Sequence, residues 1–162
     1  MKALVAYDTK FGNTQHVAEL IAEGLQEAGV EVFVQHMNSV DFDDVDGYDV
    51  ILMGSPNHIR RPTGTFNKFV KKLQKLELKG KTLVAFDTYS IGKPEENVEM
   101  KPGGSQFQVA LLKMEARLRK KLPQLKLLTP GLSIAVVGQK GPILDVELAR
   151  CKEFGKKVTT QV

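Results

Sequence analysis

The segment with the clearest chemical potential runs from Tyr7 to Thr14 and reads Tyr-Asp-Thr-Lys-Phe-Gly-Asn-Thr. It follows a short apolar run and precedes a helical pattern, so a strand, a tight turn and a helix are expected in succession. The first amides of a helix lack partners within it, and the helix dipole adds partial positive charge there. The hydroxyls of Thr9 and Thr14 and the amide of Asn13 could complete a phosphate cradle. Gly12 would permit close backbone approach to the anion.

This turn differs from two familiar nucleotide-binding loops. It lacks the glycine-rich pattern ending in Lys-Ser/Thr that cradles ATP phosphates, and it lacks the three-glycine fingerprint of dinucleotide sites. ATP and NAD are therefore not the first ligands that the sequence suggests.

A second polar segment reads Gly54-Ser-Pro-Asn-His-Ile-Arg-Arg-Pro62 and follows another apolar run. It is rich in turn-forming and polar residues. Asn57 can offer an amide to the nitrogens and carbonyls of a flat ring, and His58 or Ile59 could pack on one face of that ring. The alternative is an ordinary turn, with Pro62 as the first residue of a helix.

A third segment begins Asp87-Thr-Tyr-Ser90 and continues to Ser105, which is long for a connection in a compact α/β domain. Tyr89 is the natural stacking ring, and stacking contributes roughly 0.5 to 1.5 kcal/mol beyond area burial. Backbone amides of residues 88–90 could bond the edge of the same heterocycle. The alternative is that Tyr89 caps the end of a sheet.

Composition limits the other chemistry available. The chain has 162 residues, 42% of them hydrophobic, which suits one domain spanning residues 1–162. Its one cysteine, Cys151, excludes an internal disulfide and thiolate-rich metal sites within a single chain. The three histidines are widely spaced, so neither a serine triad nor a metal cluster is evident, and redox chemistry would need a bound cofactor. There is no signal-peptide layout and no apolar run near the ~20 residues of a membrane helix, so a soluble, cytoplasmic protein is expected.

Five apolar runs are expected to be strands. Val, Ile, Leu and Ala dominate them without strict alternation, which is typical of parallel strands covered on both faces. Helical patterns lie between the runs, and Asp41–Asp49 is either a short helix or a loop. The predicted fold class is α/β, a doubly wound five-stranded parallel sheet of order 2-1-3-4-5 with helices on both faces. In this fold ligands bind beyond the carboxyl ends of the strands, where the three polar segments would meet. The expected strands are Lys2–Tyr7, Glu31–Val34, Val50–Gly54, Thr82–Asp87 and Leu132–Val137.

With these elements in place, the chain resembles the flavodoxin family over essentially its whole length. Tyr7–Thr14 resembles the family's phosphate loop, Gly54–Asn57 the start of its first ring-binding loop, and Phe86–Ser90 its second. Gly103–Gln106, Met114–Leu118 and Gly141–Arg150 are similar to a branch of small prokaryotic flavodoxin-domain proteins.

The resemblance implies noncovalent FMN. Lys10 and Phe11 stand where the family usually has hydroxyl residues, and Asp87 occupies a glycine-rich position. Asp87 is expected to bond the amides of its own loop. The implied cofactor-binding residues are Thr9, Lys10, Phe11, Gly12, Asn13, Thr14, Ser55, Pro56, Asn57, His58, Ile59, Asp87, Thr88, Tyr89 and Ser90.

Four functions follow as alternatives. The first is an electron carrier, monomeric or homodimeric, that shuttles electrons between redox partner proteins. Because the net charge is +4, those partners are expected to be acidic. The second is an FMN-dependent NAD(P)H:quinone-type reductase, and the third is a flavodoxin-like module without tight FMN binding, favoured by Lys10, Phe11 and Asp87. The fourth, nucleic-acid binding, is prompted by cations between Lys113 and Lys126, but no recognition motif accompanies them and a solvated helix face is expected.

The positive side chains also affect the expected reduction potential of a bound flavin. Arg60 and Arg61, with Lys10 and Lys93, would stabilise a reduced, anionic flavin by screened Coulomb attraction. A final reduction step at a less negative potential than in acidic relatives is therefore expected.

Overall fold

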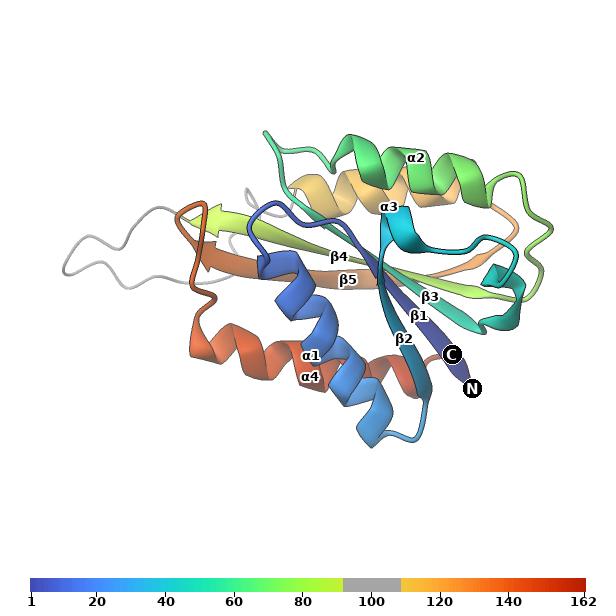
Figure 1. The fold of residues 1–162 in the computed structure, drawn as a ribbon, viewed down its shortest axis with the longest axis horizontal. Coiled ribbons are helices and arrows are strands. Elements are labelled where there is room, and N and C mark those ends of the chain that lie inside the picture. Colours follow the sequence, from blue (N-terminus) through green and yellow to red (C-terminus); the bar gives the residue numbers. More distant parts are fainter. Residues whose placement is uncertain (92–108) are drawn as a thin grey trace.

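The computed structural model describes residues 1–91 and 109–162 (Figure 1). Strands and helices alternate along the chain, as the apolar pattern predicts. In chain order the elements are β1 (Lys2–Tyr7), α1 (Asn13–Glu27), β2 (Glu31–His36), the 3-10 turns η1 (Met37–Ser39) and η2 (Val45–Gly47), β3 (Val50–Pro56), α2 (Gly64–Leu73), β4 (Thr82–Ile91), α3 (Val109–Lys121), β5 (Lys126–Val137) and α4 (Asp145–Thr159).

The five strands form one parallel sheet of order β2-β1-β3-β4-β5, which confirms the predicted topology. Helices α1 and α4 cover one face of the sheet, and α2 and α3 cover the other (Figure 1). The core accordingly has two layers. Phe66 of α2 and Met114 of α3 are fully buried in one, and Ile21 of α1 and Cys151 of α4 in the other.

Four strands are longer than the apolar runs indicate. β2, β3 and β4 extend to His36, Pro56 and Ile91, and β5 begins at Lys126. The extension of β4 matters most, because residues 88–90 were expected in a loop and instead pair with β5, Tyr89 opposite Ala135. The first half of β5 contains Pro130, which an edge strand tolerates. Asp41–Asp49, left open as helix or loop, contains the short turn η2.

None of the helices in the described ranges is long and apolar enough to cross a bilayer.

Helices α1 and α4 cross at two glycines. A Cβ added at Gly24 would lie 2.0 Å from the carbonyl oxygen of Lys152, and one at Gly155 would lie 2.2 Å from that of Ile21. The backbones can approach this closely only because neither residue has a side chain. The crossing therefore fixes the spacing of the two helices that cover this face of the sheet.

We expect Gly24→Ala to lower the free energy of unfolding by about 2–3 kcal/mol, because the added methyl group would force the helices apart. This loss opposes the gain of about 1 kcal/mol that alanine normally brings to a helix interior. Urea denaturation measures it, with Gln26→Ala on the exposed face of α1 as the control. A Gly24→Ala protein as stable as the parent would contradict the close crossing.

Candidate functional site

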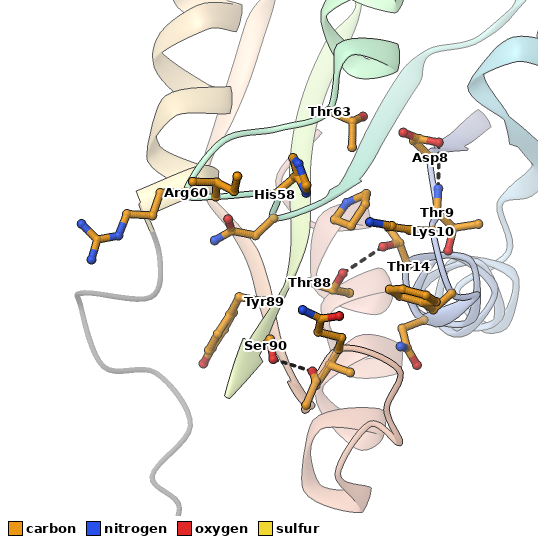
Figure 2. A pocket seen from close by; sticks show the side chains of 18 residues that line it. Asp8, Thr9, Lys10, Thr14, His58, Arg60, Thr63, Thr88, Tyr89 and Ser90 are labelled. Carbon is orange, nitrogen blue, oxygen red and sulfur yellow. Dashed lines mark hydrogen bonds between the residues drawn. The ribbon is translucent and has the colours of Figure 1, made fainter. Parts of the chain in front are cut away.

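A cavity of about 890 Å³ opens at the carboxyl edge of the sheet (Figure 2). The turn between β1 and α1, the loop between β3 and α2, the end of β4 and the loop between β5 and α4 all contribute to its wall. It lies where a doubly wound sheet binds ligands, beside the first strand. Of the residues expected to bind a cofactor, those that line the cavity are Thr9, Lys10, Phe11, Asn13, Thr14, Pro56, Asn57, His58, Ile59, Thr88, Tyr89 and Ser90.

Six further lining residues were not expected to bind a cofactor: Asp8, Arg60, Thr63, Val136, Gly138 and Gln139. Gly138 and Gln139 follow β5, and the rule that ligands meet the carboxyl ends of parallel strands applies to this strand as well. That signal was present in the sequence. Thr63 is the N-cap of α2, where its side chain accepts from the Phe66 amide.

The phosphate-type turn is closed by its own side chains. The Thr9 amide donates to Asp8 Oδ1 over 2.9 Å, and the Gly12 amide donates to Thr9 Oγ1 over 2.9 Å. Gly12 is the N-cap of α1 with a φ of 89°, a conformation that favours glycine. Gly12 does not line the cavity, so its role is to shape the turn that brings Asn13 and the first turn of α1 to it. Thr9 Oγ1 accepts one bond and keeps its proton for a ligand.

A hydrogen bond joins this turn to the end of β4. Thr14 Oγ1 and Thr88 Oγ1 are 2.9 Å apart, and both residues are buried. Figure 2 shows this bond between Thr14 and Thr88, with Tyr89 across the cavity from Lys10. The turn and the strand are thereby fixed relative to each other.

Asp8 places a carboxylate in the wall, and this carboxylate contacts a histidine. Asp8 Oδ1 lies 3.1 Å from His36 Nε2 at the end of β2. The Tyr7 ring packs edge-on against the His36 ring at 5.6 Å between centroids. These contacts anchor the start of the turn to the adjacent strand.

The loop after β3 is held to β4 and to α2. The backbone amide of Asn57 donates to the backbone carbonyl of Thr88 over 2.7 Å. Ser55, expected to bind a cofactor, is buried and does not line the cavity. Its Oγ accepts from the Thr63 amide over 2.9 Å and donates to the Pro56 carbonyl, because β3 continues through it and directs its side chain into the loop. Ser55 is therefore a structural residue in this site.

A strained turn forms the tip of this loop. His58 and Arg61 exchange backbone hydrogen bonds of 2.8 and 3.1 Å, while Ile59 and Arg60 have φ values of 51° and 60°. Positive φ at both central residues is the pattern that Asn-Gly favours, and it is unfavourable for a β-branched residue.

We expect the double variant Ile59→Asn/Arg60→Gly to raise the free energy of unfolding by about 1–2 kcal/mol, because left-handed conformations cost L-residues with large side chains about that much. Thermal and urea denaturation would measure the gain. Arg61→Gly is the matched control, since Arg61 lies outside the two positive-φ positions. If the double variant were no more stable than this control, the turn would not be strained.

Asp87 was expected to bind a cofactor and to bond the amides of its own loop. Both expectations are wrong, because Asp87 lies outside the cavity and within a strand. It is fully buried within β4, next to α3, and Ser133 Oγ donates to its Oδ1 over 2.5 Å. Successive side chains of a strand point to opposite faces, so Thr88 faces α1 while Asp87 faces the α3 side. Burial raises the pKa of Asp87 to about 7; the Ser133 bond and the Leu111 amide lower it, and the Glu115 carboxylate raises it.

The end of β4 is joined to the loop after β5. Ser90 Oγ donates to the Gly138 carbonyl over 2.5 Å, and the Tyr89 side chain is 2% exposed. Residues 92–108, which include Lys93 and the segment 103–106, lie outside the described residues. In residues 1–91 and 109–162, no group of three or more His, Cys, Asp or Glu could hold a metal ion.

The comparison with known families decides the assignment. A family model described as a flavodoxin domain matches residues 4–134. The chain belongs to the flavodoxin family. A flavodoxin from Clostridium saccharobutylicum is 30% identical over 89 residues, covering 54% of this chain and 56% of that protein. A solved flavodoxin from the domain Archaea has a TM-score of 0.78 and 25% identity, covering 99% of this chain and 98% of that one.

One relative has an enzyme name. Protoporphyrinogen IX dehydrogenase [quinone] from Escherichia coli (strain K12) is 28% identical over 72 residues, covering 44% of this chain and 40% of that protein. The first curated relatives are matched over only 32% to 56% of their own length. The activities of those whole proteins therefore come to this flavodoxin-family chain only as proposals.

The residues present suit a flavin mononucleotide. The cavity is within the range of roughly 300–1,000 Å³ typical of small-molecule sites. One side offers the N-terminus of α1 with hydroxyl and ammonium groups, which suits a phosphate. The other offers Tyr89, Ile59 and Val136, which suit a flat, largely apolar ring.

Proposed function

We propose that this flavodoxin-family protein binds FMN and carries electrons between redox proteins in the cytoplasm, as a monomer or homodimer. The observation that supports it most strongly is the meeting of the phosphate-type turn, the Asn57 loop and the end of β4 around one cavity. FMN would supply the chemistry by accepting one or two electrons at its ring. The protein binds, orients and tunes it.

Each wall of the cavity has a separate task in this proposal. The turn from Thr9 to Thr14 binds the phosphate through the first amides of α1, with Lys10 offsetting its charge. Asn57 bonds the ring edge, and Tyr89 packs against the ring. The Thr14–Thr88 hydrogen bond holds these two groups in register.

Nearby cations would make the reduction potential of the bound flavin less negative. Lys10 and Arg60 line the cavity, and Arg61 is exposed beside it. Positive charge favours the reduced, anionic flavin, so the final reduction step should lie at a less negative potential than in acidic relatives.

A second candidate is an FMN-dependent quinone-type reductase that takes its electrons from NAD(P)H. The likeness to the Escherichia coli dehydrogenase favours it. The two candidates differ in whether a nicotinamide reduces the flavin without a further protein.

Absorption spectra test the proposal. The purified protein is mixed with FMN, desalted and then treated anaerobically with NADH or NADPH. Retained flavin bands that nicotinamide does not bleach would support the carrier. Rapid bleaching, followed by recovery on adding a quinone such as menadione, would select the reductase. A protein that retains no flavin would contradict both and leave a flavodoxin-like module without tight FMN binding.

A further inference from the structure

We infer that the mouth of the cavity is a docking surface for an acidic redox protein. It rests on the proposed function, because a protein docked there would exchange electrons with the cofactor in the cavity. We define the docking rim as six exposed residues around the mouth: Lys10, Phe11, Ile59, Arg60, Arg61 and Lys140.

Exposed apolar side chains concentrate at this end of the molecule. Phe11 is 43% exposed and Ile59 is 81% exposed. Apart from Met1 and Val162 at the termini, the other large apolar residues exposed in the described ranges are Leu112 and Val146. These two lie in the first turns of α3 and α4, which begin at the same carboxyl edge of the sheet (Figure 1). Of these exposed apolar residues, Phe11 and Ile59 line the cavity, and exposed apolar surface beside a cavity is typical of an interaction site.

The backbone at Ile59, in the docking rim, is strained in the free protein. Ile59 adopts a left-handed conformation that costs about 1–2 kcal/mol, and its side chain is not buried in return. Strain of this kind concentrates at functional sites. A partner that covers Ile59 would bury the side chain that the free protein leaves exposed.

The loops around the mouth are cationic. Residues 8–12, 57–63 and 138–144 contain four Lys or Arg and one carboxylate, Asp8. Asp8 is largely buried and lies next to His36, as described above. The loop after β4, residues 92–108, is outside the described residues and is not part of this count. Within these three loops, positive charge is therefore in excess at the surface.

Two of these cations, Lys10 and Lys140, come from different loops and lie near the same aromatic ring. Lys10 Nζ and Lys140 Nζ lie 5.5 and 5.8 Å from the centroid of the same Phe11 ring. Figure 2 shows the Arg60 side chain extending away from the cavity. The Arg60 charge is thus presented outward, and Lys10 and Lys140 are exposed beside Phe11, where they can meet a second molecule.

An apolar centre with a charged border fits the anatomy of protein–protein interfaces, in which arginine is enriched. Positive potential around the border steers a negative partner and can raise association rates by roughly 10- to 1,000-fold at low salt. The exposed Ile59 side chain favours a protein over a nucleic acid, since an aliphatic group can neither stack on a base nor contact a phosphate.

The test uses the FMN-loaded full chain and two probes of opposite charge, an acidic plant-type [2Fe–2S] ferredoxin and basic cytochrome c. Stopped-flow measurements give second-order rate constants for electron transfer from reduced ferredoxin and to oxidised cytochrome c, at about 20 mM and about 300 mM salt. The rim variant Arg61→Glu/Lys140→Glu changes two residues that do not line the cavity. Its matched control, Lys71→Glu/Lys75→Glu, makes the same charge change away from the cavity. Lys71 lies in the last turn of α2, and Lys75 follows the C-terminal end of this helix.

We expect the ferredoxin rate constant to fall about tenfold or more with salt, and by a similar factor in the rim variant at low salt. The control variant should stay within about twofold of the parent. Ile59→Ser should lower the ferredoxin rate at high salt. The cytochrome c rate should not fall with salt.

Equal losses in the two charge variants, or a salt-dependent fall for cytochrome c and not for ferredoxin, would overturn the proposal. So would duplex DNA binding that the rim variant abolishes while ferredoxin kinetics are unchanged. FMN affinity is titrated separately for every protein. If the parent retains no FMN, the proposed function fails, and calorimetric binding of ferredoxin to the apoprotein, with the same variants and salts, decides docking by itself.

Discussion

Replacing Lys10 by Glu is expected to weaken FMN binding about 100-fold at low salt. Lys10 lines the cavity within the phosphate-type turn between β1 and α1. The change replaces an attraction to a phosphate dianion by a repulsion, and with solvent screening this costs about 2–3 kcal/mol. Quenching of flavin fluorescence in titrations of the apoprotein measures the affinity.

Riboflavin separates this electrostatic effect from damage to the ring site. It lacks the phosphate, so its affinity should change less than about threefold in Lys10→Glu. Lys71→Glu is the control for net charge, since Lys71 lies in the last turn of α2. Equal losses for FMN and riboflavin would show that the substitution distorts the turn and that Lys10 does not act through charge.

Stability is expected to fall by about 3 kcal/mol between about pH 5 and about pH 8 because of Asp87 alone. Its pKa is about 7 in the folded protein, against an ordinary value of 3.8. The folded state therefore holds a proton that the unfolded chain releases. The stabilisation is complete below the unfolded pKa, decreases as the pH rises, and is lost once the pH passes the folded pKa near 7.

Asp87→Asn isolates this contribution, because the amide does not ionise and still fits beside Ser133. The difference in unfolding free energy between the variant and the parent should move in favour of the variant by about 3 kcal/mol as the pH rises over that range. Asp43→Asn, at an exposed position, is the matched control and should keep the parent's pH profile. Parallel profiles for Asp87→Asn and the parent would show that the Asp87 carboxyl titrates normally in the folded state.

The strands were predictable because the inner ones are buried on both faces, which leaves continuous apolar runs in the sequence. The order 2-1-3-4-5 followed from the phosphate-type turn after the first strand, which fits a doubly wound sheet. Strand ends were not predictable to the same degree. Asp87-Thr88 and Thr129-Pro130-Gly131 contain polar and turn-forming residues that favour loops locally, whereas β4 and β5 form through pairing between segments more than 40 residues apart. Long-range pairing overrode local preference in both places.

The candidate site, too, could be predicted from the sequence only in part. Residues next to the ends of β1 and β3 could be identified from local turn chemistry. Asp87 was misplaced because the groups around it, Ser133 and Glu115, are distant in the sequence and reach it only once the sheet and α3 have assembled. That these residues bind FMN remains a prediction.

The glycine crossing of α1 and α4 has a consequence for synthesis on the ribosome. The phosphate-type turn lies within the first 14 residues, but α1 packs against Gly155 and Lys152, and a Cβ at Gly141 would lie only 2.8 Å from Asn13 Oδ1. The supports of the turn thus lie far downstream of it in the sequence. A nascent chain lacks these supports until α4 has left the exit tunnel, so cofactor capture should await the packing of α4 against α1.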